Sequence, residues 1–300
     1  DPAPAAPPLT IHTTNTPFLL HNQADGEPQR IVDHTASHDP RSIVALCKRE
    51  GIGLVIPGPE DVLDAGVADA LAEAGIACFG PTRFGATLEA SKIYGKHWLG
   101  KCGVPTPNAE EYEPGQCGEL IRAMTARARD PRRGIDFVLK ANGLAGGKGV
   151  FVPDSLEEAV VAAEYLLGRA DALEGDDRLV LLEDRCYGEE CSLIGYCDGT
   201  QVHFGPQAQD YKRLEDGDRG PNTGGMGAVC PVSVLSPVEV GRLAEQMSIM
   251  VRELKYSGFL YLAVMRSRAG RASGAGHGEY SVIEINCRLG DPEAQVLLPT

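Results

Sequence analysis

The chain has 300 residues, a length that predicts two domains or one large one at about 100–200 residues per domain. A hydrophobic share of 43% and a charged share of 23% exclude wholesale disorder, and no uninterrupted apolar run approaches the roughly 20 residues of a membrane-spanning helix. The net charge of −14 argues against binding to nucleic acid or to an anionic membrane, but it allows a local basic pocket.

Nine cysteines are scattered along the chain without a Cys-x-x-Cys pair, so the sequence predicts neither a disulfide framework nor a zinc site. We therefore expect reduced thiols and a cytoplasmic location. The chain begins at Asp1 and is rich in proline over its first eight residues. We interpret residues 1–16 as a flexible leader or a trimmed end.

The first third of the chain alternates short strands with helices. Asp39 followed by Pro40 is typical of a helix start, and Gly51 is typical of a helix end. Strands separated by helices of this length indicate parallel βαβ units, so we predict an α/β domain over 17–106. We expect strands at 18–20, 30–32, 53–56 and 76–79, and helices at 40–50, 64–74 and 90–102.

The rest of the chain predicts an α+β arrangement built mainly on antiparallel strands. We divide it into 107–182, which holds a glycine-rich hairpin, and 183–300. Helices are expected at 117–129 and at 236–254. A further helix is expected to follow Ser155, because Ser155 and Glu158 have the spacing of a capping box. The expected strands lie at 136–141, 150–153, 178–183, 191–196, 201–204, 259–265 and 280–286. A long loop is expected at 207–231 and a hairpin tip at 266–278.

The glycine-rich hairpin could bring backbone N–H groups close to an anion. Its glycines are Gly143, Gly146, Gly147 and Gly149, and Lys148 and the strand residue Lys140 add positive charge. It is not a P-loop, because only three residues separate Gly143 from Gly147 and a glycine stands where Ser or Thr is required. Taken alone, the segment is better explained as a flexible hairpin with a solvated lysine.

The segment 282–286 predicts a strand with two oxygen ligands. Because strand side chains alternate, Glu284 and Asn286 point the same way, whereas Ile283 and Ile285 are expected to point into the core. Such a pair suits Mg²⁺, which takes further ligands from water and substrate phosphates. The alternative is a half-exposed strand with a polar face, which is the commoner situation.

Two polar loops supply further candidates. Asp210, Lys212 and Arg213 precede the glycine-rich run 220–227, and cations that alternate with backbone donors are typical of an anion cradle. By composition, a solvated mobile loop explains this segment equally well. In the acidic run 183–191, Glu190 suits ribose hydroxyls because a carboxylate accepts two hydrogen bonds. A solvated acidic turn is the simpler explanation of that run.

The motifs occur in one order along the chain, and their combination is far more specific than any single one. They are Gly58-Pro59-Glu60, Phe79-Gly80-Pro81-Thr82, Ser91-Lys92, LKANGLAGGKG at 139–149, Gly188-Glu189-Glu190, QDYKR at 209–213, GPNTGGMG at 220–227 and EINCRLGDPE at 284–293. From about Ile43 onward, the chain closely resembles the glycinamide ribonucleotide synthetase (phosphoribosylamine–glycine ligase) family of the ATP-grasp superfamily.

The resemblance implies an α/β, Rossmann-like pre-ATP-grasp domain followed by an α+β ATP-grasp domain, with the family's small C-terminal domain absent from this chain. It implies ATP-dependent joining of glycine to 5-phosphoribosylamine through a glycyl phosphate, with ATP and Mg²⁺ or Mn²⁺ as cofactors. It also implies fusion to or association with other purine-pathway enzymes. Such chemistry needs positioning and charge neutralisation rather than a protein nucleophile.

The resemblance also implies the roles of individual residues. ATP would be bound by Lys92, Lys140, Gly143, Gly146, Gly147, Lys148, Gly149, Glu183 and Glu190. The metal would be held by Glu284 and Asn286, and the catalytic residues would be Arg288, Lys212 and Asp210. The substrates would be bound by Arg213, Asn222, Thr223, Gly224, Gly225, Met226, Gly227 and Asp291.

The sequence departs from the family pattern in several places. The glycine loop with which the family begins is missing, and Arg185-Cys186 follows the acids Glu183-Asp184 where the family usually has apolar residues. Asn142 replaces a customary Asp, and 267–278 looks like an insertion. Two alternatives therefore stay open: a nucleotide-binding remnant without ligase activity, and an ATP-grasp ligase with a different carboxylate and amine pair.

Overall fold

The computed structural model describes residues 11–12, 32–33, 38–131, 133–145, 149–170, 173, 175–217, 219–267 and 280–299. The strand expected at 18–20 and most of the hairpin tip expected at 266–278 lie outside these residues. Two residues of the expected leader, Ile11–His12, form strand β1, which pairs in parallel with β2 (Val32–Asp33).

The N-terminal part has the expected alternation of parallel strands and helices. Helix α1 (Pro40–Glu50) begins after Asp39, whose carboxylate accepts a hydrogen bond from the Ser42 backbone N–H at 3.1 Å, and it ends at Gly51 with φ 67°. Strand β3 (Leu54–Val55) pairs in parallel with β4 (Ala77–Cys78). These elements confirm the predicted α/β organisation of this part of the chain.

Two helix predictions in this part are wrong in their limits. The helix expected at 64–74 is two helices, α2 (Glu60–Asp64) and α3 (Val67–Glu73), because Gly66 between them has φ 88° and interrupts the helical backbone. The helix expected at 90–102 begins later, as α5 (Lys92–Lys101), and α4 (Arg83–Ala90) precedes it. Ser91 separates this pair, since its backbone is extended and its hydroxyl accepts from the Tyr94 N–H.

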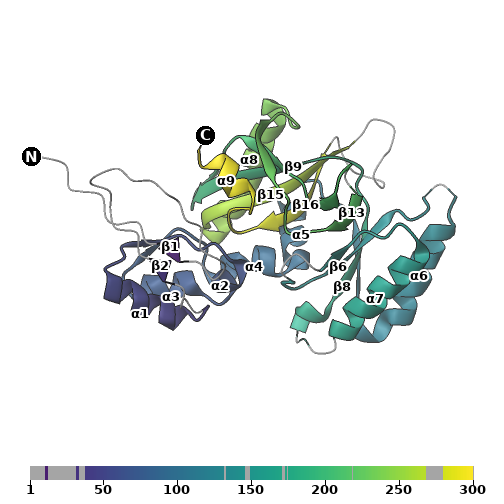
Figure 1. Cartoon of the computed structure of the whole chain (residues 1–300), viewed down its shortest axis with the longest axis horizontal. Helices are drawn as coiled ribbons and strands as arrows, with labels where there is room; N and C mark the ends of the chain where they lie inside the picture. The colour runs from purple at the N-terminus through teal and green to yellow at the C-terminus, as the bar shows by residue number, and fades with distance from the viewer. Residues whose placement is uncertain are drawn as a thin grey trace, which may run out of the picture.

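The small lobe, residues 109–184, is an antiparallel sheet with its own helices. The strand order is β5 (Ala109–Tyr112), β8 (Val180–Asp184), β6 (Phe137–Ala141) and β7 (Val150–Phe151). Helices α6 (Cys117–Arg129) and α7 (Leu156–Ala170) lie side by side at the opposite end of the molecule from α1 and α3 (Figure 1). Short 3-10 turns lie at Pro114–Gln116 and Gly175–Arg178.

The large lobe, the described residues from 188 to 299, is built on a longer antiparallel sheet. Its path is β14 (Ala228–Val232), β11 (Gln207–Asp210), β9 (Gly188–Asp198), β15 (Ser257–Ser267) and β16 (Tyr280–Asn286), and β10 (Val202–Phe204) also pairs with β9. Helices α8 (Pro237–Leu254) and α9 (Glu293–Leu297) complete the lobe. Both lobes confirm the predicted α+β, largely antiparallel arrangement.

The prediction of a long loop at 207–231 is wrong. That segment contains β11, β14 and a separate hairpin of β12 (Arg213–Glu215) and β13 (Arg219–Asn222). The polar and glycine-rich composition hides β11, β12 and β13, because these strands are held by backbone pairing with other strands and have little apolar surface of their own. Ala208, which is fully buried and pairs with Ser192 of β9, is the main packing residue of β11.

The described residues form two large hydrophobic clusters, and one of them combines parts of the chain that are far apart in the sequence. One joins the N-terminal helices to the large lobe and includes Leu63, Leu88, Leu99, Met247 and Leu262. The other belongs to the small lobe alone and includes Leu120, Met124, Phe137, Leu139 and Leu182. The N-terminal part and the large lobe therefore pack as one body, and the small lobe has a separate core.

The helices and the cysteines can also be compared with the predictions. No helix in the described part of the chain is both long enough and apolar enough to cross a bilayer. All nine cysteines lie among the described residues, and none of them forms a disulfide.

Candidate active site

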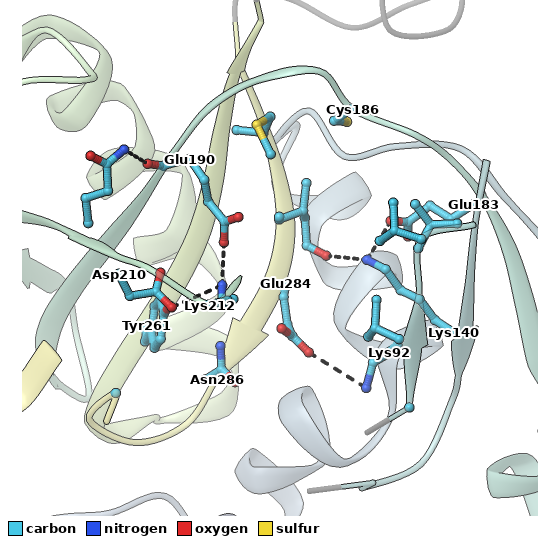
Figure 2. A pocket seen from close by; sticks show the side chains of 18 of the residues that line it. Lys92, Lys140, Glu183, Cys186, Glu190, Asp210, Lys212, Tyr261, Glu284 and Asn286 are labelled. Carbon is cyan, nitrogen blue, oxygen red and sulfur yellow. Dashed lines mark hydrogen bonds and ion pairs between the residues drawn. The ribbon is translucent and has the colours of Figure 1, made fainter. Parts of the chain in front are cut away.

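A cavity of about 1380 Å³ lies where the two lobes face each other, and most of the expected site residues line it. Figure 2 shows Lys92 of α5 and Lys140 of β6 on one side of Glu284, and Asp210 of β11 and Lys212 on its other side. The expected residues that line the cavity are Lys92, Lys140, Gly149, Glu183, Glu190, Asp210, Lys212, Arg213, Thr223, Gly224, Glu284, Asn286, Arg288 and Asp291. Residues far apart in the sequence are thus brought to one place.

Other expected residues are not placed in the cavity wall. Gly143 lies against Asp177, and Gly225 lies against Pro292 with φ 128°, a backbone conformation that favours glycine. Met226 is largely exposed, and Gly227 does not line the cavity. Gly146, Gly147 and Lys148 lie outside the described residues, and the side chain of Asn222 is likewise outside them.

The pair Glu284 and Asn286 lines the cavity from one face of β16, as the strand alternation predicts. Ile285 packs in the large hydrophobic cluster, but the expectation that Ile283 shares this core is wrong. The pairing register shifts at this point, since Ala263 pairs with Glu284 whereas Val264 pairs with Val282. The resulting β-bulge places Ile283 in a smaller cluster with Ile194 and Tyr261 and frees its carbonyl.

The charges around Glu284 keep it ionised. Burial raises its pKa, but the nearby Lys92, Lys140 and Lys212 outweigh that effect and leave the pKa below its ordinary value. Its nearest described cation is Lys92, with Nζ 3.8 Å from Oε1. In the described part of the chain, no group of three or more His, Cys, Asp or Glu side chains could hold a metal. A two-donor set of carboxylate and amide oxygens suits Mg²⁺ that takes its other ligands from phosphate and water.

A second group of charges lies on the large-lobe side of the cavity. Lys212 Nζ is 2.6 Å from Glu190 Oε1 and 3.4 Å from Asp210 Oδ2 (Figure 2). Burial lowers the pKa of Lys212, but the two carboxylates raise it by more than burial lowers it, so the net shift of the pKa is upward. Burial raises the pKa of Asp210, although Lys212 partly offsets this. Lys212 therefore keeps its positive charge, and Asp210 is the carboxylate of this group that is suited to accept a proton.

Arg288 is held by two carboxylates from the N-terminal helices. Its Nε lies 2.7 Å from Glu60 Oε2, and its Nη2 lies 3.1 Å from Glu89 Oε1. Glu89 also accepts a hydrogen bond from the Cys287 backbone N–H at 2.6 Å, so it fixes the backbone beside Arg288 as well. Glu89 was not predicted as a site residue, because it lies within a helix and in no motif; Glu60 belongs to the motif Gly58-Pro59-Glu60 but had no expected role.

A buried carboxylate below Asp210 was also missed. Glu293 is 2% exposed, and its Oε1 accepts hydrogen bonds from Ser192 Oγ at 2.9 Å and from Tyr261 Oη at 2.7 Å. All three residues lie in or beside the large-lobe sheet. Burial and the charges of Glu293 and Asp210 raise the pKa of Tyr261 far above its ordinary value, so its hydroxyl stays protonated and donates. The only sequence signal was the place of Glu293 at the end of the 284–293 motif.

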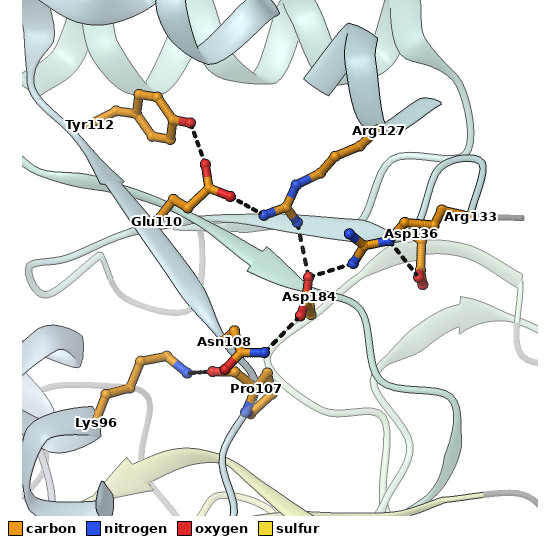
Figure 3. Close-up of polar contacts among 9 residues, drawn as sticks. All are labelled: Lys96, Pro107, Asn108, Glu110, Tyr112, Arg127, Arg133, Asp136 and Asp184. Carbon is orange, nitrogen blue, oxygen red and sulfur yellow. Dashed lines mark hydrogen bonds and ion pairs between the residues drawn. The ribbon is translucent and has the colours of Figure 1, made fainter. Parts of the chain in front are cut away.

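The segment that joins the lobes is anchored on the small-lobe side by Asp184. Its Oδ1 lies 3.0 Å from both Arg127 Nη1 and Arg133 Nη2, and its Oδ2 accepts from Asn108 Nδ2 at 3.2 Å (Figure 3). Arg127 also contacts Glu110 at 2.5 Å. Asp184, one of the two acids at the start of this segment, therefore has partners for both of its carboxylate oxygens within the small lobe and the residues beside it.

Two lobes that face each other across a charged cavity, with lysines on one side and a Glu-x-Asn strand on the other, define an ATP-grasp protein. Within that class, the chain belongs to the phosphoribosylglycinamide synthetase family. The model of the family's N domain matches residues 17–89, and the model of its ATP-grasp (A) domain matches residues 90–294.

Named relatives agree with this assignment. The phosphoribosylamine–glycine ligase of Ralstonia nicotianae is 39% identical over 267 residues, which are 87% of this chain and 59% of that protein. A trifunctional purine biosynthetic protein adenosine-3 of Chironomus tentans is 38% identical over 87% of this chain and 18% of its own length. The crystal structure of phosphoribosylamine–glycine ligase from Thermotoga maritima has a TM-score of 0.59 at 34% identity, covering 74% of this chain and 53% of that one. The chain thus spans less than two thirds of these relatives.

Proposed function

We propose that this chain carries the ATP-dependent ligation of glycine to 5-phosphoribosylamine, which yields glycinamide ribonucleotide, ADP and phosphate. The observation that carries the proposal is the cavity itself, where Lys92, Lys140 and Arg288 face the oxygen pair Glu284 and Asn286. This arrangement suits a reaction that transfers a phosphoryl group and needs its negative charge neutralised. The names of the relatives support the same reaction.

We assign the nucleotide phosphates to Lys92 and Lys140, and the ribose to the carboxylate of Glu190. Glu284 and Asn286 would hold Mg²⁺ or Mn²⁺, because an ionised carboxylate and an amide oxygen stand on one face of a rigid strand. When bound, such a cation would neutralise phosphate charge and orient the phosphates. Gly149, which lines the cavity at the end of the glycine hairpin, would let the backbone approach them.

The proposed chemistry has two steps. A carboxylate oxygen of glycine attacks the γ-phosphorus of ATP, and the bond from that phosphorus to ADP breaks, which leaves a glycyl phosphate. The nitrogen of 5-phosphoribosylamine then attacks the acyl carbon, and the carbon–oxygen bond to phosphate breaks. The nitrogen loses one proton, for which Asp210 is our candidate acceptor because burial raises its pKa.

The remaining cations would hold the substrates. Arg288, fixed by Glu60 and Glu89, presents a guanidinium suited to a carboxylate or phosphate. Lys212 would bind the transferring phosphoryl group, and Arg213, Thr223, Gly224 and Asp291 would line the substrate side. Asn222, Gly225, Met226 and Gly227 belong to the same loop, and we keep them as substrate-binding candidates.

We further propose that the activity is cytoplasmic and that it is joined to, or associated with, other purine-pathway enzymes. The unpaired state of all nine cysteines suits a reducing compartment. The trifunctional name of the Chironomus tentans relative motivates the expectation of fusion.

The test is ADP release by the purified chain with ATP, Mg²⁺, glycine and freshly prepared 5-phosphoribosylamine. ADP release that requires both glycine and the amine, together with formation of glycinamide ribonucleotide, supports the proposal. ADP or ATP binding without any such turnover would favour a nucleotide-binding remnant. Turnover with another carboxylate and amine pair, in a panel measured alongside, would favour a ligase of different specificity.

A further inference from the structure

Lys96 is a partly buried lysine, with 17% of its side chain exposed, that the proposed function leaves without a role. It lies on α5 four residues after Lys92, so both lysines extend from the same face of that helix. Its Nζ contacts Thr106 Oγ1 at 3.0 Å, the Pro107 carbonyl oxygen at 2.8 Å (Figure 3) and Glu183 Oε2 at 2.7 Å. An ammonium group has three N–H donors. Lys96 therefore donates two hydrogen bonds and forms an ion pair with Glu183, and its side chain is not in the wall of the large cavity.

Lys140 lies on the other side of the same carboxylate. Glu183 is 2% exposed, and its Oε1 is 2.6 Å from Lys140 Nζ. Lys140 also donates to the Ile283 carbonyl oxygen at 3.0 Å, which the β-bulge of β16 makes available (Figure 2). Within the described residues, these contacts use two of the three donors of Lys140. The third N–H is left for a ligand in the cavity that Lys140 lines.

The charges of this group do not cancel. A carboxylate with one lysine is neutral, whereas Glu183 with both lysines carries a net positive charge. Burial lowers the pKa of Lys96, and Glu183 only partly offsets that effect. Burial also lowers the pKa of Lys140, but Glu183 and Glu284 reverse the shift, so Lys140 keeps its proton. The positive charge is therefore available at the cavity as long as Lys96 balances Glu183.

We propose that Lys96 is a positioning residue for nucleotide phosphate binding: it anchors and neutralises Glu183, so that Lys140 presents one N–H and a net positive charge to a phosphate oxygen. This inference rests on the proposed function, and it adds a residue that does not itself touch the ligand. It predicts that removing the ammonium group of Lys96 leaves Lys140 neutralised by Glu183. Binding of a phosphorylated nucleotide should then weaken, whereas binding of the nucleoside alone should not.

The experiment compares ADP and adenosine binding by isothermal titration calorimetry on the whole chain. For Lys96→Met, we expect the dissociation constant of ADP to rise about tenfold, as one lost charge-assisted contact implies. The dissociation constant of adenosine should change less than about twofold. Lys101→Met is the matched control, because Lys101 lies on the same helix, is exposed and pairs with Glu253 outside the cavity. It should leave both constants unchanged.

A second variant allows the proposal to be tested even if Lys96→Met does not fold. Thr106→Val removes one oxygen contact of Lys96 at nearly constant volume, so it should shift ADP binding in the same direction by about two- to threefold. Urea unfolding of each variant checks that the fold is retained. In steady-state assays, Lys96→Met should raise the KM for ATP and leave the KM for glycine unchanged.

The outcomes separate the inference from the proposed function. Unaltered ADP binding in both variants would overturn the role of Lys96. An equal loss of ADP and adenosine affinity would also overturn it, since that result indicates a general structural effect. Failure of the unmodified chain to bind ADP at all would overturn the proposed function together with the inference.

Discussion

At the scale of single residues, the two carboxylates that hold Arg288 connect the site to the N-terminal helices. Glu60 and Glu89 come from α2 and α4, whereas Arg288 follows β16. Such a guanidinium, held on two sides, keeps one orientation and needs little ordering when it binds an anion. The pair therefore makes the N-terminal part a component of the site and not only a neighbour of it.

Glu89→Gln is expected to remove part of the pH dependence of stability. Burial raises the pKa of Glu89 to about 7 from its ordinary value of 4.5, although Arg288 offsets part of the shift. Because the native pKa is above the unfolded one, this group contributes stability below pH 4.5 that is lost as the pH rises through 7. Urea unfolding from about pH 5 to about pH 8 should show a shallower fall of the unfolding free energy in the variant.

The control for this experiment is Glu73→Gln, at an exposed position that ends α3. It should reproduce the pH profile of the unmodified chain. Parallel profiles for Glu89→Gln and the unmodified chain would show that Glu89 does not titrate in this range.

Glu284→Ala is expected to abolish ligase activity and to leave the fold intact. The change removes the carboxylate of the proposed metal pair, so we expect kcat to fall by about a thousandfold or more. Glu245→Ala, at an exposed position on α8, is the matched control and should keep full turnover. Near-normal turnover of Glu284→Ala, measured as ADP release, would contradict the metal assignment.

At the scale of elements, helix α5 carries two of the lysines to which the proposals above assign a role. It carries both Lys92 and Lys96, and it packs closely against α4. A Cβ atom added at Gly95 would lie 2.8 Å from the Leu88 carbonyl oxygen, a backbone atom that cannot turn aside. The glycine therefore sets how closely the two helices approach.

Gly95→Ala should therefore destabilise the protein by about 1–3 kcal/mol, because the clash outweighs the better helix propensity of alanine. Gly100→Ala on the same helix has open space around the new methyl group, so it should stabilise the protein by about 0.5–1 kcal/mol. Urea denaturation measures both changes. Stabilisation by both substitutions would show that α5 can move away from α4 without cost.

Features that depend on contacts between residues close in the sequence were predictable, whereas features that depend on contacts between residues far apart in the sequence were not. Asp39 and Ser236 cap helices through hydrogen bonds that span three residues, so a short pattern shows them. The bond from the Cys287 N–H to Glu89 spans 198 residues, and no short pattern shows it. The bulge at Ile283 and the strands hidden in the expected loop likewise depend on pairing with other strands. Most of the candidate site residues nevertheless line one cavity, and they could be proposed because their motifs are contiguous in the sequence.

At the scale of the whole molecule, the two large hydrophobic clusters stabilise different parts of the protein. The small lobe packs around its own core, whereas the N-terminal helices and the large lobe share one. Parts of a protein with separate cores can open separately. The cavity lies between these two parts, so motion of the small lobe would widen or narrow it without disrupting either core.

Leu139→Ala and Leu260→Ala test this division by native-state hydrogen exchange. Each leucine is fully buried, so each substitution should lower the free energy of unfolding by about 2–5 kcal/mol. Leu139→Ala should increase exchange in α6, α7 and the small-lobe sheet but leave α8 and β15 protected. Leu260→Ala should increase exchange in β15 and in α4 and α5 alike, since they share its cluster. Equal effects of both variants across the whole chain would indicate a single cooperative unit.

The cations of the cavity already have anionic partners supplied by the protein. Lys212 pairs with Glu190 and Arg288 with Glu60, Lys92 lies near Glu284, and Lys140 shares Glu183 with Lys96. A nucleotide phosphate that binds here would exchange one counterion for another, and few ions from the solvent would be released. Affinity should therefore depend on bulk salt less steeply than the number of lysines and arginines suggests. An acidic protein can in this way hold a polyanionic ligand without an exposed basic surface.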